Sequence, residues 1–169
     1  MDDAERLLAE ALEALGFSGD PEMARTPERV AELLRGFVPD PEPPAVSDFP
    51  SPGDGPVVLR DVPFHSLCVH HLLPFFGTVT IVYRPGERVA GFGGLARVVR
   101  HYAQRPQLQE RLAEQVAGRL VDALAPRGLV VRVVARQLCM EMRGTRSAGE
   151  AEVLALRGET GDLVGLARG

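Results

Sequence analysis

Residues 57–85 read VVLRDVPFHSLCVHHLLPFFGTVTIVYRP, and this stretch carries most of the information about the fold. The runs at 57–66 and 75–85 are rich in β-branched and aromatic residues, and both read as strands. Between them lies CVHH, residues 68–71, in a chain that has only two cysteines and four histidines. The stretch therefore predicts two strands joined by a turn that carries reactive side chains.

Two helices are expected before this stretch. The segment DDAERLLAEALEALG places Leu and Ala at helical spacing, and Gly16 is a natural stop. In TPERVAELLRGF, Thr26 is a suitable N-cap and Pro27 fits the first helical position. PDPEPPAVSDFPSPGDGP, which follows, is dense in Pro, Gly and acids and predicts an extended surface connection. We expect residues 1–56 to hold these helices and the connection, and 57–169 to form the main body.

The rest of the body predicts further strands around two helices. GERVAGF indicates a turn and a short strand, and LARVVRHYAQ indicates a helix. A second helix is expected over PQLQERLAEQVAGRLVDALAP, opened by Pro106. GLVVRVVARQLCMEM and EAEVLALRG read as closing strands. Pairs of strands on either side of two consecutive helices predict an α+β fold with an antiparallel sheet.

Composition excludes several classes of protein. A chain of 169 residues with 45% hydrophobic content predicts one globular structural unit. The net charge of -4 argues against nucleic-acid binding. No apolar run approaches the length of a membrane span, and the acidic start MDDAERLL is unlike a signal peptide, so we expect a cytoplasmic protein without a membrane partner. Two cysteines in such a chain favour a metal or reactive site over a disulfide.

Cysteine and histidine are the ligands that zinc prefers in proteins. Cys68 and His71 have the short spacing that lets one turn hold two ligands, and Cys139 follows a distant strand that could deliver a third. Three protein ligands leave a position for water, whose pKa zinc lowers towards neutrality. His70 would lie beside the metal without binding it, in a position for general acid–base work.

The same side chains allow other interpretations. Cysteine is among the most buried residue types, so Cys68 and Cys139 could each be inert core residues. A cysteine–histidine nucleophile pair is a second alternative. His65 and His101 have no partner signal in the sequence, and we treat them as ordinary surface or core histidines.

Five motifs in fixed order resemble GTP cyclohydrolase I: TPERVAEL, PFHSLCVHHLLPFFG, GLARVV, RPQLQERLAEQVA and CMEMRG. They cover about residues 24–145. The resemblance implies a tunnel-fold subunit, with antiparallel strands and two helices on one face, in a ring-shaped homo-oligomer such as a decamer with active sites at subunit boundaries. Members of that family open the imidazole ring of GTP with a zinc-activated water, release C8 as formate and close a pterin ring.

The resemblance also implies roles for single residues. By matching position, Cys68, His71 and Cys139 are the zinc ligands. His70 matches the residue that transfers protons in catalysis. Gln109 and Glu110 match the segment that recognises guanine, where a carboxylate can accept from ring N–H and amino groups. Arg97 and Arg143 match residues that hold the triphosphate, a role suited to a permanently charged, multidentate donor.

The sequence departs from the family pattern at three places. Gln137 stands where a second catalytic histidine is expected, and glutamine cannot exchange a proton near neutral pH. Gly93 and Gly94 replace a Ser-Lys pair. All nineteen basic residues of the chain are Arg, but a bias against Lys does not explain this loss, because it should give Arg where a charge is needed. TRSAGEAEVLALRGETGD replaces a Ser/Thr-rich hairpin. Three changes at the substrate site, with the metal ligands kept, suggest an altered function.

The leading hypothesis is a zinc-dependent hydrolase, acting on cyclic amidine C–N bonds, that opens the imidazole ring of GTP or a related guanine-type purine at C8. Its reaction would stop before pterin formation, and the enzyme would belong to secondary metabolism. Gln137 would bind the substrate but would not transfer protons. One alternative is an ordinary GTP cyclohydrolase I that makes 7,8-dihydroneopterin triphosphate. A second alternative is an enzyme of the same kind whose substrate lacks the triphosphate. Two further alternatives are an NADPH-dependent nitrile reductase with a cysteine nucleophile and a non-catalytic purine-binding regulatory homologue.

Overall fold

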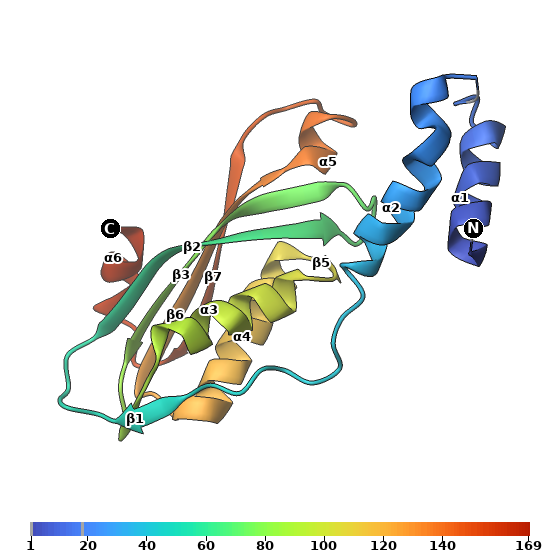
Figure 1. The fold of residues 1–169 in the computed structure, drawn as a ribbon. Coiled ribbons are helices and arrows are strands. Elements are labelled where there is room, and N and C mark those ends of the chain that lie inside the picture. The colour runs from blue at the N-terminus through green and yellow to red at the C-terminus, as the bar shows by residue number, and fades with distance from the viewer. Residues whose placement is uncertain (1, 18) are drawn as a thin grey trace. The chain divides into compact units, whose positions relative to one another are not determined.

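The computed structural model describes residues 2–17 and 19–169, in two compact units, Met1–Val38 and Pro39–Gly169. The first unit contains helices α1 (Asp3–Ala14), η1 (Pro21–Arg25) and α2 (Thr26–Arg35) (Figure 1). Asp2 and Glu5 form a capping box at the start of α1, in which each side chain accepts a hydrogen bond from the other's backbone N–H. Gly16 ends α1 at a φ of +86°, so the expected stop is confirmed.

The expected N-cap at Thr26 is wrong. The 3-10 helix η1 runs directly into α2, so Thr26 is already helical and Arg25 occupies the N-cap position without a side-chain cap bond. Arg25 instead donates two hydrogen bonds of 2.8 Å to the carboxylate of Glu28. Pro27 lies in the first turn of α2, as expected.

The second unit contains a five-stranded sheet in the order β5-β2-β3-β6-β7. The strands are β2 (Val57–Cys68), β3 (Pro74–Arg84), β5 (Pro106–Gln107), β6 (Gly128–Gln137) and β7 (Glu150–Gly158). All pairings are antiparallel except that of β5 with β2. A separate ribbon pairs β1 (Asp48–Pro50) with β4 (Arg88–Ala90). The helices of this unit are α3 (Phe92–Ala103), α4 (Gln109–Leu124), α5 (Leu138–Glu141) and α6 (Leu163–Arg168) (Figure 1).

The main core lies between one face of the sheet and helices α3 and α4. Alternate residues of the strands face these helices, as the two-residue period of a strand requires. The buried cluster includes Phe64, Phe75, Ile81, Val131 and Val133 from the strands and Leu95, Val98, Leu112, Val116 and Leu120 from the helices. A smaller cluster joins α6 to the other face through Val82, Val130, Leu163 and Ala167. The predicted α+β fold, an antiparallel sheet with two helices on one face after an N-terminal helical segment, is confirmed.

The pairing of β3 with β6 depends on a glycine. Gly77 lies opposite Ala135, and a Cβ atom added at Gly77 would lie 1.9 Å from the carbonyl oxygen of Val134. A larger residue would therefore push the two strands apart. This close approach sits near the end of β6 from which Cys139 follows.

The start of α4 differs from the prediction. Pro106 does not open the helix but belongs to β5, where it pairs with Leu67 at the end of β2. Leu108 takes the N-cap position, and α4 begins at Gln109. Proline has no backbone N–H to donate, and an edge strand tolerates this because only one of its sides is paired. The consequence is that the first residues of α4 lie beside the Cys-His turn.

Three further segments have structure that the composition did not predict. Residues 39–56 pack with the second unit, through the β1–β4 ribbon and through a 3.1 Å hydrogen bond from Arg119 to the carbonyl of Pro44. The long run that contains Cys139 leaves the sheet at Gln137 and turns into α5. Helix α6 was not expected at all. None of the helices in the described part of the chain is long and apolar enough to cross a membrane.

Candidate metal centre and substrate pocket

The Cys-His turn begins where β2 ends. The backbone N–H groups of His71 and Leu72 donate to the carbonyl of Cys68, and the N–H of Cys68 donates to the carbonyl of Leu73 at 2.8 Å. Leu72 has a φ of +53°, an uncommon conformation for a residue with a side chain. The tight turn folds the ring of His71 back towards Cys68.

Three predicted metal ligands meet at this turn. The ligand atoms of Cys68, His71 and Cys139 all lie within 4.8 Å of one another, and the Sγ of Cys68 lies 3.7 Å from the Nδ1 of His71. With usual zinc bond lengths and tetrahedral angles, sulfur and nitrogen ligands of one zinc ion stand about 3.6 Å apart. The donor types and their spacing therefore fit zinc with three protein ligands.

The surroundings of the metal group change the pKa of one of its cysteines. Burial raises the pKa of the Cys139 thiol above its usual value, and a hydrogen bond with Cys68 adds to the rise. A thiol with a raised pKa resists ionisation, whereas zinc binds cysteine as the thiolate. A metal ion would supply the positive charge that this pair of sulfur atoms requires.

Arg143 contacts the same histidine from its other side. An NH1 group of Arg143 lies 2.5 Å from the Nε2 of His71. Since a guanidinium can only donate, Nε2 must be the acceptor and the ring proton must lie on Nδ1. Ligation of a metal by Nδ1 needs the proton on Nε2 instead. The Arg143 contact and metal ligation through Nδ1 therefore exclude each other.

A pocket of about 250 Å³ opens beside the metal group. Its walls include Cys68, His70, Gln109, Glu110, Gln137 and Cys139. His70 is exposed, and its Nδ1 lies 4.0 Å from the Sγ of Cys68, within reach of a molecule held near the metal. Most of the predicted site residues thus share one pocket. Its volume is slightly below the usual range of about 300–1,000 Å³ for small-molecule sites.

Gln109 is almost fully buried and its side chain is fully engaged. Its Nε2 donates to the carbonyls of Val133 on β6 and Ala151 on β7, at 3.0 and 2.8 Å. Its Oε1 accepts a hydrogen bond of 2.8 Å from the Nε2 of Gln137. Gln109 therefore ties the start of α4 to two strands, and it supports Gln137 in the pocket wall.

A residue that sequence reasoning did not single out holds this segment together. Gln107 is 0% exposed, and its Nε2 donates to the carbonyl of Tyr102 and to the Oε1 of Gln115. Its own Oε1 accepts from the backbone N–H of Leu108 and from Arg111. The available signal was the first glutamine of the QLQER motif, because a buried glutamine needs partners for its hydrogen bonds.

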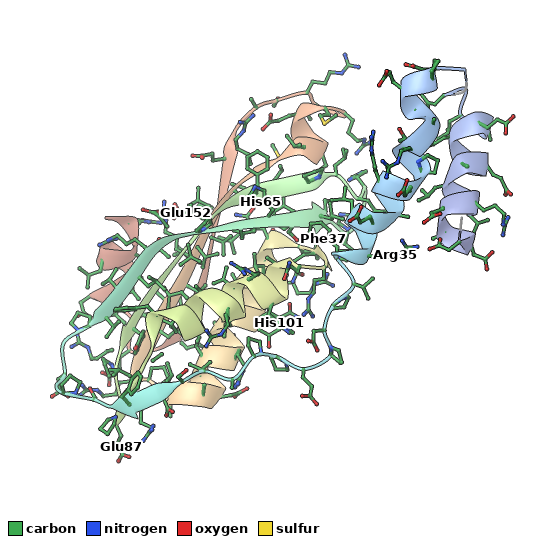
Figure 2. All side chains as sticks on the ribbon, in the orientation of Figure 1. Arg35, Phe37, His65, Glu87, His101 and Glu152 are labelled. Atoms are coloured by element: carbon green, nitrogen blue, oxygen red, sulfur yellow. The ribbon has the colours of Figure 1, made fainter. Side chains whose placement is uncertain are left out.

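Arg97 lies elsewhere on the chain. It lines a different cavity, with Arg100 and His101 of α3 and Asp40, and His101 is labelled in Figure 2. Arg97 makes no ion pair with any other described residue. The structure therefore brings Arg143 to the metal group within one chain, but it does not bring Arg97 there.

The two glycines in the first turn of α3, Gly93 and Gly94, have room for a Cβ atom. A Cβ atom at Gly93 would have its nearest contact with Arg97 at 3.6 Å, and one at Gly94 would lie 3.5 Å from the backbone of Ser47. These are ordinary van der Waals distances, and neither glycine has a positive φ. Nothing in the backbone requires glycine at these two positions.

The chain was compared with known proteins. A family model described as GTP cyclohydrolase I matches residues 4–162. Proteins named GTP cyclohydrolase 1 from Streptococcus agalactiae serotype Ia and Streptococcus thermophilus are each 43% identical over 155 residues, which cover 88% of this chain and 83% of the relative. The protein of the same name from Streptococcus sanguinis is 42% identical over 154 residues, covering 88% and 84%. A crystal structure of the archaeosine synthase QueF-Like in its apo form aligns with a TM-score of 0.47 and 22% identity, over 64% of this chain and 97% of that chain.

Proposed function

Because this chain belongs to the GTP cyclohydrolase I family, we propose that it opens the imidazole ring of GTP or a related guanine-type purine at C8. The observation that carries the proposal is that two members of the metal group, Cys68 and Cys139, line one pocket with His70 and Glu110, while His71 completes the group at its edge. These are the parts that hydrolysis of a purine ring needs: a metal site, a proton carrier and a carboxylate for the base.

The chemistry divides between a metal ion and the protein. Cys68, His71 and Cys139 would hold zinc, which when bound activates water for attack on the ring carbon. His70 delivers a proton to the ring nitrogen as the C8–N bond breaks, so that the product is a formamide. An imidazole exchanges protons near neutral pH, which makes His70 the suitable carrier among the pocket residues.

Substrate recognition follows from charge and hydrogen-bonding capacity. The carboxylate of Glu110, at the start of α4, can accept from the ring N–H and the amino group of guanine. Gln109 supports the amide of Gln137, which orients the substrate by hydrogen bonding. Arg143 is released from His71 when the histidine binds metal, and its guanidinium can then pair with a phosphate group.

Arg97 supports the proposal of an oligomer. It lies outside the pocket of its own chain, so it can serve as a phosphate-binding residue only in the site of a neighbouring copy. A ring-shaped homo-oligomer, such as a decamer, with sites at the subunit boundaries would meet this requirement. The modest volume of the pocket in one chain supports the same proposal.

The reaction of this chain would stop before pterin formation. Gln137 offers an amide where a second proton carrier would be needed for the later rearrangement of the ribose. Gly93 and Gly94 supply neither a hydroxyl group nor a cation for the triphosphate, although a Cβ atom would meet only ordinary contacts at either position. The resulting product is a ring-opened formamide or a diaminopyrimidine.

A direct assay separates this proposal from its main alternative. GTP is incubated with zinc-loaded protein, and the products are followed by mass and absorbance, with His70→Ala as the inactive control. Accumulation of a ring-opened product supports early termination. Efficient formation of a fluorescent dihydropterin overturns it and supports the complete cyclohydrolase reaction, which the 43% identity to proteins of that name favours. Absence of turnover with any guanine-type purine would indicate a regulatory homologue.

A further inference from the structure

The short helix α5, which carries Cys139, is too short to be stable without contacts to the rest of the fold. Helix α5 spans only Leu138–Glu141, and no side chain caps its first turn. A backbone hydrogen bond of 2.9 Å runs from the N–H of Met142, just after the helix, to the carbonyl of Leu138. A single helical turn is unstable by itself, because nucleation of a helix is unfavourable. The position of Cys139 must therefore depend on contacts of the turn with the strands.

A bidentate ion pair fastens the end of this turn to the sheet. Arg136, near the end of β6, donates its Nε to one carboxylate oxygen of Glu141 at 3.0 Å and its NH2 to the other at 2.7 Å. The side chain of Glu141 is only 15% exposed. Two parallel hydrogen bonds from a rigid guanidinium set both distance and orientation, which a single contact would not do. Cys139 lies between the two partners of this pair in sequence.

The guanidinium is itself held by a row of rings that crosses the sheet. Its central carbon lies 5.8 Å from the centre of the Phe76 ring on β3, and that ring stacks on His65 of β2 at 5.9 Å and 26°. The strand register places Phe76 directly between His65 and Arg136 (His65 is labelled in Figure 2). His65 and Arg136 each lie three residues before one of the metal-binding cysteines. The row thus connects the two chain segments that deliver those cysteines.

We propose that the Arg136–Glu141 pair is a positioning device for the metal centre, which sets the affinity of the Cys68, His71 and Cys139 group for zinc. The inference rests on the proposed function, because it assumes that this group holds the metal. Neither partner touches the metal: Arg136 fixes Glu141, and Glu141 fixes the turn from which Cys139 projects. Loss of the pair leaves all three ligands present but no longer held at the spacing that zinc requires.

The test measures zinc affinity of the full chain by competition with a chromophoric chelator. Glu141→Gln keeps the size of the side chain and removes its charge, and it should weaken zinc binding by about 10- to 100-fold, the range found when groups that orient metal ligands are changed. Arg136→Lys keeps the charge but loses the planar fork, and it should show a smaller loss. Unfolding of the metal-free variants, followed by circular dichroism, establishes that each is folded.

The chain offers a matched control on the same strand. Arg132 of β6 also pairs with a carboxylate of the sheet away from the metal group: its Nε and NH2 donate to one oxygen of Glu152 on β7, at 3.1 and 2.8 Å, and Arg168 donates to the other oxygen. Glu152→Gln should leave zinc affinity unchanged. The proposal is overturned if Glu141→Gln binds zinc as tightly as the wild type, or if both variants lose affinity equally. Failure of the wild-type protein to bind zinc would overturn the proposed function as well, so the two failures are distinguishable.

Discussion

Gln137 donates its side-chain amide to the Oε1 of Gln109, at 2.8 Å, and the direction of this hydrogen bond is determined by the neighbouring strands. Two backbone carbonyls, which can only accept, face the other end of the Gln109 amide. The nitrogen of Gln109 must therefore lie at the carbonyls and its oxygen at Gln137. Gln137 keeps its own oxygen for the pocket, and that oxygen accepts no hydrogen bond from a described residue.

Changing Gln137 to histidine should not restore pterin formation. Gln137→His supplies a proton carrier at the expected place, but Gly93 and Gly94 still leave the phosphate groups of the substrate less firmly held. We expect dihydropterin fluorescence to stay at the wild-type level when the variant is given GTP. Strong dihydropterin synthesis by this single variant would show that one missing proton carrier separates the chain from its relatives. Gln137→Ala serves as the control for simple loss of the amide.

Changing Gln109 to leucine should destabilise the fold. Gln109→Leu leaves the carbonyls of Val133 and Ala151 without their donor in a buried place, at a cost of about 1–3 kcal/mol for a buried polar group left unsatisfied. Urea unfolding measures the free energy of unfolding. Gln104→Leu, on the exposed end of α3, is the control and should have little effect. Equal stability of Gln109→Leu and the wild type would contradict this account of the buried amide.

His70 should matter for catalysis but not for metal binding. His70→Ala should lower the rate of ring opening by about 10²–10⁴-fold, the usual contribution of a general acid–base group. The zinc content of the purified variant should stay at the wild-type value, because His70 does not belong to the metal group. Loss of zinc from His70→Ala would instead assign this histidine to the metal.

Arg143 should compete with the metal for His71. Arg143→Leu removes the donor that faces the Nε2 of His71, together with a nearby positive charge. If the lost hydrogen bond is worth about 1 kcal/mol, zinc affinity should rise about fivefold. Chelator competition measures this change, and weaker binding of triphosphate should accompany it. Unchanged or weaker zinc binding would show that Arg143 does not oppose ligation by His71.

Tyr83 should make the fold sensitive to high pH. Its buried hydroxyl oxygen accepts the backbone N–H of Ala90 at 3.0 Å, and burial raises the pKa of the Tyr83 phenol above its usual value of 10.0. The neutral phenol is the form that the fold favours, so its contribution is complete below the unfolded-state pKa and is lost as pH rises through the folded-state pKa.

Stability measurements across alkaline pH test this expectation. Tyr83→Phe leaves the Ala90 N–H without its acceptor and should lose about 1–3 kcal/mol at neutral pH. Its remaining stability should fall less steeply than that of the wild type as pH rises towards the tyrosine range. A parallel decline in both proteins would show that Tyr83 does not carry the alkaline sensitivity.

Sequence reasoning was most accurate where the determining forces are local. The β-branched and aromatic residues of 57–66 and 75–85 predicted β2 and β3, since such side chains suit the pleated, half-buried surface of a sheet. It failed at Pro106, which was assigned to a helix because proline favours the first helical turn. The parallel pairing of that residue with Leu67 is a long-range contact, and no local signal announces it.

The sequence by itself determined which ligands the chain possesses and that Cys68 and His71 can share one turn, because neighbours in a tight turn cannot lie far apart. Only the tertiary structure decided that Cys139 joins them, because its place depends on the register of β6 against β3 and on the close approach at Gly77. The tertiary structure alone also decided that the amide of Gln109 is engaged, while the side-chain oxygen of Gln137 accepts from none of the described residues. The reason is physical: the hydrogen bonds of a buried amide must be satisfied by whichever groups the fold brings near, and here those groups come from strands distant in sequence.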